Sequence, residues 1–542
     1  MSKQPSPPNI LFIMCDQLRA DYLSCYGHPH LETPNIDRIA ARGVRFDRAY
    51  VQSPVCGPSR MSFYTGRYAF SHGATINYAP LPLEELTLGD YLRPLGVRTA
   101  IVGKTHFRAN AAGLKRLGVD PNSDLGIQVA EGGFEPYFRD DGIHPDRKTR
   151  SGGAYNDYLR QQGYEADNPW HRHANGALDE TGVFQSGWFM ENANRPADIE
   201  EEHSETPATT TRAMQFIEEA ETTGQSWCLH LSYIKPHWPY IAPAPYHNMY
   251  NEAHMVPLNR QESERHNPHP VYEAFMQHRD SAVFQREGAR EAIVAAYMGL
   301  IKQVDDQIGR LLDFLEVRDE LDNTFIVFTS DHGDYLGDHW LGEKDLFHEE
   351  SIRIPMIVVD PSAASDKTRG SRSNQLIEAI DLVPTFIEVA GGAPPNHRLE
   401  GRSLLPLLHA SSAETTDIPW RKYAISEMDY SYRTAREQLD VPPQQCRAFM
   451  IRTDRWKYID YEGFRPQLFD LHNDPNEWHD LGDDPDYQAI RDQLGAELFA
   501  WLRQRKIRVT LSDSEIETMF GGTNQSKRGV YLGFWSPDEV PE

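Results

Sequence analysis

The sequence predicts an α/β protein with a large, doubly wound and mostly parallel sheet flanked by helices. Several short runs are apolar nearly throughout and do not alternate, as expected of parallel strands that helices cover on both faces. They are residues 9–15, 99–103, 227–233, 324–330 and 354–360. Between them lie segments with helical spacing of apolar residues, at 34–42, 208–220 and 291–317. This alternation of strands and helices is typical of doubly wound domains.

The length of the chain indicates more than one domain. At 542 residues it is long for a single hydrophobic core, so we expect two domains. A change in texture near residue 415 predicts a large α/β domain over residues 1–414 and a smaller one over 415–542. Residues 108–200 are rich in Gly, Asp, Asn and Arg with little periodicity. We therefore expect long loop insertions there, where binding surfaces often lie.

The smaller domain is predicted to hold a short antiparallel sheet and a helix. Residues 455–461 and 467–471 have the pattern of strands, and residues 474–476 (Asp-Pro-Asn) that of a turn. A helix is expected from about residue 486 to 505, followed by a polar tail.

Composition limits the class of function. A hydrophobic fraction of 39% and a charged fraction of 25% are those of a soluble globular enzyme. The formal net charge of −26 disfavours nucleic acid and anionic membranes as partners, because their binding proteins usually present a basic surface. A small anionic substrate stays possible, since a few residues can make a basic pocket. The apolar run near the N-terminus is short for a secretion signal, and no stretch approaches the ~18 apolar residues of a membrane span, so we expect a cytoplasmic protein.

The five cysteines do not form a disulfide framework, because they are too few and too scattered. Four of them are interpreted as small buried apolar residues: Cys15, Cys25, Cys228 and Cys446. The fifth, Cys56, lies in a motif described below.

Polar clusters follow four of the predicted strands. They are Asp16-Gln17, Gly103-Lys104-Thr105-His106, Lys235-Pro236-His237 and Ser330-Asp331-His332-Gly333. Open α/β sheets bind ligands at the carboxyl ends of their strands, so these clusters should converge in space. A single such cluster could be a helix cap or a surface group, but four in sequence order are hard to explain by capping alone.

A divalent-metal site is one interpretation of these clusters. Asp16 and Asp331 would supply carboxylates, Gln17 an amide oxygen and His332 an imidazole. Oxygen ligands suit calcium or magnesium, whereas the imidazole favours manganese or a similar ion. The alternative is that Asp331 caps the following helix and His332 is a structural histidine; spacing alone leaves the two open.

The segment from Ser53 to Arg60, SPVCGPSR, followed by Thr65-Gly66-Arg67, resembles the signature of the sulfatase family. In that family C-x-P-S-R directs oxidation of the cysteine to formylglycine, and Cys56, Pro58, Ser59 and Arg60 match it. The pattern becomes specific with the segments NILFIMCDQ, GKTHF, KPHWPY, TSDHGDYLGDH and LGEK in the same order. The resemblance covers nearly the whole chain, including WKY, LFDL and DPNEWHDL near the C-terminus.

The resemblance implies a metal-dependent hydrolase of the arylsulfatase type with a formylglycine hydrate nucleophile at Cys56. It also implies maturation by a formylglycine-generating enzyme, a small anionic ester as substrate, and one divalent metal, calcium or manganese. The implied metal ligands are Asp16, Gln17, the modified Cys56, Asp331 and His332. The implied catalytic and substrate-binding residues are Arg60, which fixes the hydrate, Lys104 and His106 near the sulfate, His237 as proton donor to the leaving oxygen, Lys344 beside the bridging oxygen, and Asn77 as a weaker substrate contact. For the lysines, the alternative role is a solvated surface charge.

Two positions depart from the commonest sulfatase pattern. Gln17 stands where many members have a second aspartate, and His332 where they have an asparagine. This combination resembles the phosphonate monoester hydrolases and the arylsulfatases nearest to them, within the alkaline phosphatase superfamily. The phosphonate hydrolases of that group lack the residues found here as Lys104 and His106, which favours sulfate esters with promiscuous action on phosphonate monoesters and phosphodiesters. A main activity on phosphonates or phosphodiesters is the alternative, and a non-catalytic binding protein is a third.

The leaving group and the assembly are not specified by the sequence. Several aromatic residues could line an aryl pocket, although core packing is the alternative for most: Trp170, Trp188, Phe189, Trp238 and Tyr240. Similarity to the same subgroup implies a homo-oligomer, a tetramer or dimer, with the polar C-terminal tail as a segment that could reach a neighbour.

Overall fold

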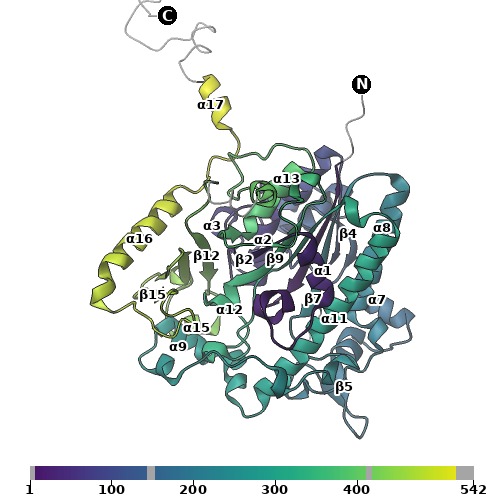
Figure 1. Ribbon diagram of the computed structural model, residues 1–542, viewed down its shortest axis with the longest axis horizontal. Coiled ribbons are helices and arrows are strands. Elements are labelled where there is room, and N and C mark those ends of the chain that lie inside the picture. Colours follow the sequence, from purple (N-terminus) through teal and green to yellow (C-terminus); the bar gives the residue numbers. More distant parts are fainter. Residues whose placement is uncertain (1–6, 143–152, 411–417, 520–542) are drawn as a thin grey trace, which may run out of the picture.

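The computed structural model describes residues 7–142, 153–410 and 418–519, and the predicted fold class is confirmed. A nine-stranded, mostly parallel sheet runs through the larger part of the molecule (Figure 1). Along its main path the strands lie in the order β10 (Ser371–Ser373), β2 (Val44–Tyr50), β9 (Arg353–Val359), β8 (Thr324–Ser330), β1 (Asn9–Asp16), β7 (Trp227–Pro236), β3 (Arg98–Gly103) and β4 (Glu135–Arg139), with β11 (Ile377–Glu378) also paired to β2.

All five predicted strands are present, but the direction of one was wrong. β9 pairs antiparallel with both β8 and β2, whereas β1, β3, β7 and β8 are parallel. An apolar run indicates that a strand is buried on both faces, but it does not indicate whether the strand is parallel or antiparallel to its neighbours. The strands β2 and β4 were not predicted. In β2, buried residues alternate with half-buried charged ones, so β2 lacks the continuous apolar run by which the other strands were predicted.

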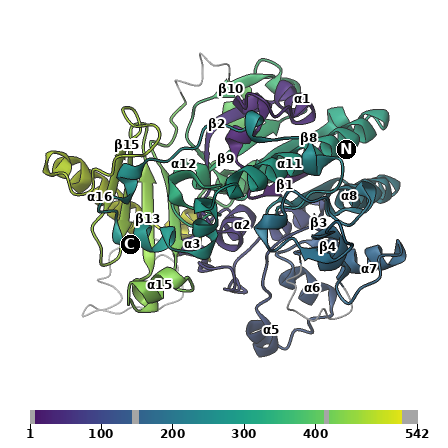
Figure 2. The ribbon, with the colours of Figure 1, turned by 90° about the horizontal axis from the view of Figure 1, so that it is seen from below.

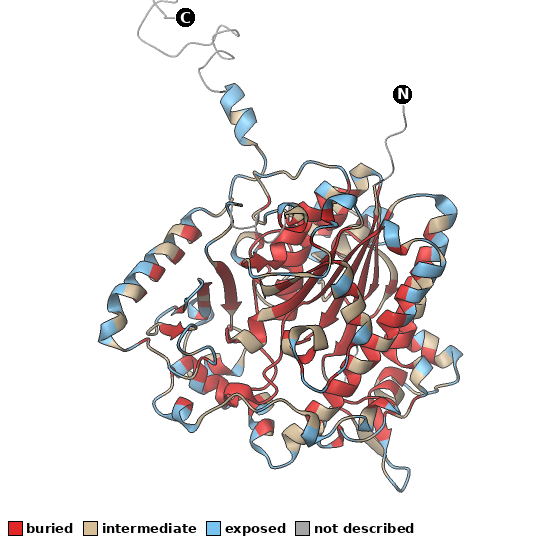
Figure 3. Ribbon diagram, viewed as in Figure 1, coloured by how far each residue is buried: buried red, intermediate tan, exposed pale blue. Residues whose placement is uncertain are grey.

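The sheet is buried on both faces because side chains of a strand point alternately to either side. In β1, Ile10, Phe12 and Met14 enter one hydrophobic core, and Leu11, Ile13 and Cys15 enter the core on the other face. The central strands are buried along their lengths (Figure 3). Because packing on both faces holds the central strands in place, it also fixes where their carboxyl ends lie.

Helices cover the two faces. On one face pack α1 (Pro34–Arg42), α8 (Glu205–Thr223) and α11 (Ala289–Val317), which correspond to the three predicted helices. On the other face lie α2 (Cys56–Thr65), α4 (Leu88–Leu92) and α13 (Leu382–Val389), with Phe63 and Phe386 packed against Phe12. Figure 2 shows α8 and α11 on the same side of the sheet.

Residues 108–200 contain more regular structure than the expected loops. They hold α5 (Ala111–Leu117), α6 (Asp124–Ala130), β4, α7 (Ala154–Gln161) and a π-helical turn at Trp170–Ala174. A two-stranded ribbon of β5 (Gly176–Leu178) and β6 (Phe184–Ser186) follows. These elements are short, and their polar faces give little periodicity for a sequence pattern to detect.

The C-terminal part forms a second sheet, in the order β12 (Ala424–Asp429), β13 (Arg447–Arg452), β14 (Trp456–Tyr461) and β15 (Gln467–Asp470), entirely antiparallel. The two predicted strands and the predicted helix, α16 (Gln488–Arg503), are confirmed. This sheet and α16 lie at one end of the molecule (Figure 2). The boundary at residue 414 stays a prediction, and the tail beyond α17 (Asp513–Met519) lies outside the described residues.

Among the described residues, no helix is both long and apolar enough to cross a membrane.

Candidate active site and metal centre

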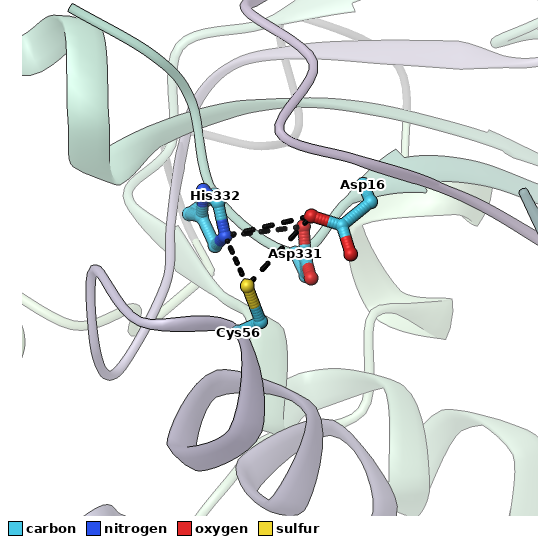
Figure 4. Close-up of side chains that lie close together, drawn as sticks. All are labelled: Asp16, Cys56, Asp331 and His332. Atoms are coloured by element: carbon cyan, nitrogen blue, oxygen red, sulfur yellow. Dashed lines mark hydrogen bonds and ion pairs between the residues drawn. The ribbon is translucent and has the colours of Figure 1, made fainter. Parts of the chain in front are cut away.

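Four side chains from three separate segments converge at the carboxyl edge of the sheet (Figure 4). Asp16 ends β1, Asp331 and His332 follow β8, and Cys56 begins α2. Their ligand atoms all lie within 4.8 Å of one another, and all four residues are buried. Cys56 Sγ is 3.0 Å from His332 Nε2 and 3.7 Å from Asp16 Oδ1.

Neighbouring groups fix the direction in which these ligand atoms point. His332 Nδ1 donates to the carbonyl of Gly333 over 2.8 Å, which leaves Nε2 facing the cluster. Asp16 and Asp331 each give one carboxylate oxygen to Arg60, so that Oδ1 of both is left on the side of His332, at 3.7 Å from Nε2. Second contacts of this kind are what orients ligands in metal sites.

Helix α2 delivers Cys56 to the cluster at its first position. Val55 precedes the helix in an extended conformation, and Pro58 falls in the first turn, where a missing N–H leaves no helical bond unmade. The N-terminus of a helix favours negative charge, so the position of Cys56 at the start of α2 is suited to an anion. Ser59 Oγ donates to the Asp331 carbonyl over 2.6 Å and so holds the helix start against the end of β8.

Asn77 also supports the start of α2. Its Oδ1 accepts the Gly57 N–H over 2.8 Å, and a Cβ at position 57 would lie 2.9 Å from that oxygen. The glycine in the Cys56 motif therefore permits a close contact. Asn77 lines the cavity above Cys56 as well, so its predicted contact with substrate stays a prediction.

Arg60 is fully buried and joins the two carboxylates. Its Nε donates to Asp331 Oδ2 over 2.8 Å and its Nη2 lies 3.3 Å from Asp16 Oδ2. The remaining nitrogen, Nη1, donates to the Lys104 carbonyl and to Ser232 Oγ. Arg60 thus ties β1, β3, β7 and β8 together at the site. A fork of donors with this geometry is specific to arginine.

The Gln17 amide is held by two residues that the sequence did not identify. Its Nε2 donates to Asp334 Oδ2 over 2.6 Å and to the Tyr240 hydroxyl over 3.1 Å. The oxygen Oε1 therefore points the other way and accepts from Lys344 Nζ over 2.8 Å. Gln17 has φ 65°, a left-handed conformation that carries strain for a non-glycine residue. Metal ligation by Oε1 stays a prediction.

Lys344 is a buried ammonium group without a close acidic partner. It is 5% exposed, and no carboxylate of the described residues lies within 4.0 Å of its Nζ. The amino group donates instead to Gln17 Oε1 and to His237 Nε2, the latter over 3.2 Å. Burial lowers the pKa of Lys344, but the charges of Cys56, Glu343 and Asp16 outweigh burial and raise it, so the group is protonated.

His237 is set beside Lys344 as an acceptor. Its Nδ1 donates to the Trp238 carbonyl over 2.7 Å. Nε2 is therefore the nitrogen that accepts the hydrogen bond from Lys344 Nζ. Burial lowers the pKa of His237 to about 3, although Asp16 acts in the opposite direction. A buried imidazole next to an ammonium group is held in its neutral form, and the role of His237 as proton donor to the leaving oxygen stays a prediction.

Lys104 and His106 both lie at the site, in different ways. Lys104 Nζ is 2.5 Å from Asp16 Oδ2, so its charge is paired inside the protein. His106 is half-buried and lines the cavity; its backbone, at φ 53°, donates to Asp141 Oδ1, and its ring Nδ1 has no hydrogen-bond partner among the described residues. Asp141 was not recognised from the sequence, because it lies in the segment taken for loops.

A cavity of about 520 Å³ opens above Cys56. Around Cys56 its lining includes Lys104, His106, His237 and Lys344. Three of the five aromatic candidates line the same cavity, namely Trp170, Trp188 and Trp238. Tyr240 instead bonds to Gln17 and Asp334, and Phe189 is 65% exposed away from this lining.

The donor set fits a divalent cation. Two carboxylates, one imidazole nitrogen and the Cys56 side chain lie together, and the carboxylates and the imidazole are each oriented by a second contact. Burial lowers the pKa of His332, but Asp331 and Cys56 outweigh it and raise the pKa to about 9, so the cluster favours positive charge. The sulfur of Cys56 suits softer ions, whereas the oxygens of a formylglycine hydrate at the same position would suit calcium or manganese.

A doubly wound sheet that carries such a cluster and buried lysines at its carboxyl edge defines a hydrolase of anionic esters. The family model described as Sulfatase matches residues 8–393, and the model described as N-sulphoglucosamine sulphohydrolase, C-terminal, matches residues 337–504. The chain belongs to the sulfatase family, within the alkaline phosphatase superfamily, and the predicted enzyme class is confirmed.

Three relatives illustrate the range of this family. The chain is 30% identical to the multifunctional alkaline phosphatase superfamily protein PehA of Trinickia caryophylli, over 91% of this chain and 95% of that one. It is 27% identical to an arylsulfatase of Clostridium perfringens, over 92% and 95%. The structure of the phosphonate monoester hydrolase SpPMH from Silicibacter pomeroyi is similar with a TM-score of 0.79 and 27% identity, covering 93% of this chain and 96% of that one.

Proposed function

We propose that this chain hydrolyses sulfate monoesters of the aryl type, with a formylglycine hydrate made from Cys56 as nucleophile. The observation that supports this most is Lys344, a buried ammonium group that lines the same cavity as Cys56 and has no carboxylate within 4.0 Å among the described residues. An unpaired buried charge is costly, and an anionic ester bound there would offset that cost.

The proposed reaction proceeds in two halves on the side chain at position 56. One hydroxyl of the hydrate attacks sulfur as the bond from sulfur to the leaving oxygen breaks. The second hydroxyl then loses its proton, the aldehyde forms again, and the bond from carbon to the sulfate oxygen breaks, which releases sulfate. Water then adds to the aldehyde and restores the hydrate. An unmodified thiol lacks this second step, so the modification explains how turnover is completed.

Arg60, Lys104 and the start of α2 prepare the nucleophile. Arg60 holds both carboxylates in place, and Lys104 balances the charge of Asp16. A divalent cation bound by Asp16, Asp331, His332, position 56 and Gln17 would lower the pKa of a hydroxyl on position 56. Calcium or manganese is the proposed ion.

The Lys344–His237 pair would serve the leaving oxygen. Lys344 carries the proton and His237 Nε2 accepts a hydrogen bond from it, so the ammonium group is oriented without being neutralised. A donor fixed in this way can stabilise the charge that develops on the bridging oxygen.

Hydrolysis of phosphonate monoesters and phosphodiesters is the second candidate, as a promiscuous or main activity. Gln17 and His332 at the metal cluster favour it, as does the likeness to SpPMH. Lys104 and His106 favour sulfate by resemblance. Both ester classes carry a single negative charge, so charge alone does not separate them.

The experiment is a comparison of kcat/KM for 4-nitrophenyl sulfate, 4-nitrophenyl phenylphosphonate and a bis(4-nitrophenyl) phosphate. We expect the sulfate to be the best substrate. If the phosphonate exceeds it by orders of magnitude, the second candidate replaces the first. Mass spectrometry of the peptide that spans Cys56 separates both from a non-catalytic protein, because formylglycine lowers the peptide mass and an unmodified thiol does not.

The biological setting is also proposed by resemblance: a cytoplasmic homo-oligomer, tetramer or dimer, matured by a formylglycine-generating enzyme. Light scattering of the purified protein tests the assembly, and co-expression with a formylglycine-generating enzyme should raise the modified fraction of Cys56.

A further inference from the structure

Glu343 is a buried carboxyl group on the wall of the catalytic cavity. It is 8% exposed, lines the cavity next to Lys344, and has φ 56°, a conformation that carries strain for a non-glycine residue. Among the described residues its side chain has no hydrogen bond, and no cation lies within 4.0 Å of it. Neither of its carboxyl oxygens is among the fully buried atoms that lack a partner, so the carboxyl group reaches the open cavity.

The charges near Glu343 are occupied elsewhere. Arg433, on the same wall, donates both Nε and Nη2 to Asp345 Oδ1, at 3.0 and 2.5 Å. Lys344 donates to Gln17 and His237. Burial and the charge of Asp280 raise the pKa of Glu343 to about 8, against the effects of Lys344 and Arg433. The carboxyl group therefore keeps its hydrogen-bonding capacity for something that enters the cavity.

The same cavity has an aromatic side. Trp188 and Trp238 meet edge to face with ring centroids 4.9 Å apart, and Trp170 lies 6.1 Å from Trp188. Trp238 also packs near the ammonium group of Lys344, at 5.9 Å from the ring centroid. An organic group attached to an ester at Cys56 would thus meet apolar rings and, on the cavity wall beside Lys344, the carboxyl group of Glu343.

We propose that Glu343 is a specificity residue that selects leaving groups carrying a hydrogen-bond donor, a hydroxyl or an ammonium group, near the ester oxygen. This inference rests on the proposed function, since it assumes an ester held at Cys56. The donor of the leaving group would supply the hydrogen bond that Glu343 lacks within the protein. A site that provides such a partner discriminates against an analogue without the donor.

A different role for Glu343 would be to support the charge of Lys344, its neighbour in sequence. The two roles predict different results. Support of Lys344 affects every substrate by the same factor, because Lys344 serves the ester group. Contact with the leaving group affects only substrates that carry the donor.

The test uses two matched pairs of substrates. 4-Nitrocatechol sulfate differs from 4-nitrophenyl sulfate by one hydroxyl beside the ester, and 4-(2-aminoethyl)phenyl sulfate differs from 4-ethylphenyl sulfate by one ammonium group. For each pair the ratio of kcat/KM, donor over no donor, is measured in the wild type, in Glu343→Leu and in Glu343→Gln. Glu273→Gln, an exposed carboxylate on α9 (Pro270–Met276), is the control.

We expect Glu343→Leu to lower at least one of the two ratios about tenfold, the worth of one hydrogen bond. Glu343→Gln should keep the hydroxyl ratio within about threefold, because an amide oxygen still accepts, and should lower the ammonium ratio if that pair is the one selected. Glu273→Gln should change neither ratio. The two pairs thereby distinguish a hydroxyl from an ammonium leaving group.

The inference is overturned if Glu343→Leu lowers kcat/KM equally within each pair, or leaves both ratios within about twofold of the wild type. If Glu343→Leu does not fold, Glu343→Ala takes its place and is judged by the same two ratios, because alanine also removes the acceptor. If the wild type cleaves no sulfate, the proposed function fails, and the same leaving groups are then presented as phenylphosphonate esters. The ratios on those esters test Glu343 independently of the ester class.

Discussion

Replacing Lys344 by methionine tests the electrostatic reasoning on which the proposed function depends. Methionine keeps most of the length of the side chain and removes the charge. In the structure Lys344 donates to Gln17 Oε1 and His237 Nε2, and no carboxylate of the described residues is paired with it. The substitution therefore removes a preorganised donor from the reaction site while leaving two neutral acceptors without a partner.

Lys344→Met should reduce activity more than it reduces the free energy of unfolding. Loss of one preorganised charged donor at the developing charge costs about 2.7–4 kcal/mol, so kcat/KM should fall about 10²- to 10³-fold. Two neutral acceptors that lose a partner cost about 1–3 kcal/mol together when one of them reaches water through the cavity. We expect Lys344→Met to be nearly inactive and only moderately destabilised.

Lys235→Met is the matched control. Lys235 is also buried and lies on the same side of the sheet, at the end of β7, but its Nζ is 3.4 Å from Glu205 and donates to Asn175 over 2.7 Å. Removing it leaves the buried Glu205 carboxylate without its cation, which costs about 3–5 kcal/mol. Lys235→Met should therefore lose more stability than Lys344→Met and keep more of its activity.

The assay is kcat/KM on 4-nitrophenyl sulfate together with unfolding in urea. The reasoning is refuted if Lys344→Met keeps more than about a fifth of the wild-type kcat/KM, since ~1 kcal/mol is too little for a transition-state donor. It is also refuted if the order of the two variants in stability is reversed.

Three further predictions concern the nucleophile, the metal and the pH dependence of stability. Cys56→Ser should release leaving group once per active site and then stop, since a sulfated serine has no second hydroxyl to eliminate sulfate, whereas Cys56→Ala should show no burst; steady turnover by Cys56→Ser would contradict the mechanism. Dialysis against a chelator should abolish activity and lower the free energy of unfolding, by about 2.7 kcal/mol if the metal had been at 100 times its Kd, and calcium or manganese should restore both; full activity after removal of all metal would contradict a metal role. Burial lowers the pKa of His339, but Glu350 and Glu264 outweigh it and raise it to about 10. The stability that this histidine contributes is therefore complete below about pH 6.5 and is lost by about 1.4 kcal/mol per pH unit up to about pH 10, so the gap in unfolding free energy between wild type and His339→Gln should be wider at about pH 6 than at about pH 9; a constant gap would show that folding does not shift the pKa of His339.

Much of the fold could be predicted because its central strands are buried on both faces. Residues 9–15 are apolar nearly throughout because alternate side chains enter the two cores, Phe12 on one face and Ile13 on the other. The same reasoning fails at the margins of the sheet. β2 has charged residues on its half-exposed side, so it shows no continuous apolar run. The antiparallel direction of β9 depends on how it pairs with β2 and β8, and the residues of β9 alone do not indicate it.

For the site, the sequence predicted which residues come together better than how they are arranged. Asp16, Asp331 and His332 follow strands that end at one edge, so their convergence with the Cys56 motif follows from topology. The roles of Asp334 and Tyr240 could not be predicted, because both act through the Gln17 amide and only the folded backbone brings them within hydrogen-bonding distance. Likewise, the low pKa of His237 arises from burial beside Lys344, which a motif does not express.

The contacts also change the weight of the two lysines in deciding between sulfate and phosphonate esters. Resemblance groups Lys104 with His106 as features of sulfatases, yet the charge of Lys104 is paired with Asp16 at 2.5 Å and so acts first on the metal cluster. Lys344 is a buried cation without an acidic partner among the described residues, and the exposed Arg108 lines the same cavity. Because sulfate monoesters and phosphonate monoesters carry the same charge at the reacting group, Lys344 cannot favour one of them by charge alone. The two esters differ instead at phosphorus, where a carbon substituent must be accommodated, and in the leaving group. Selectivity should therefore depend on the shape of the cavity around Lys344, its tryptophan side and Glu343, more than on Lys104.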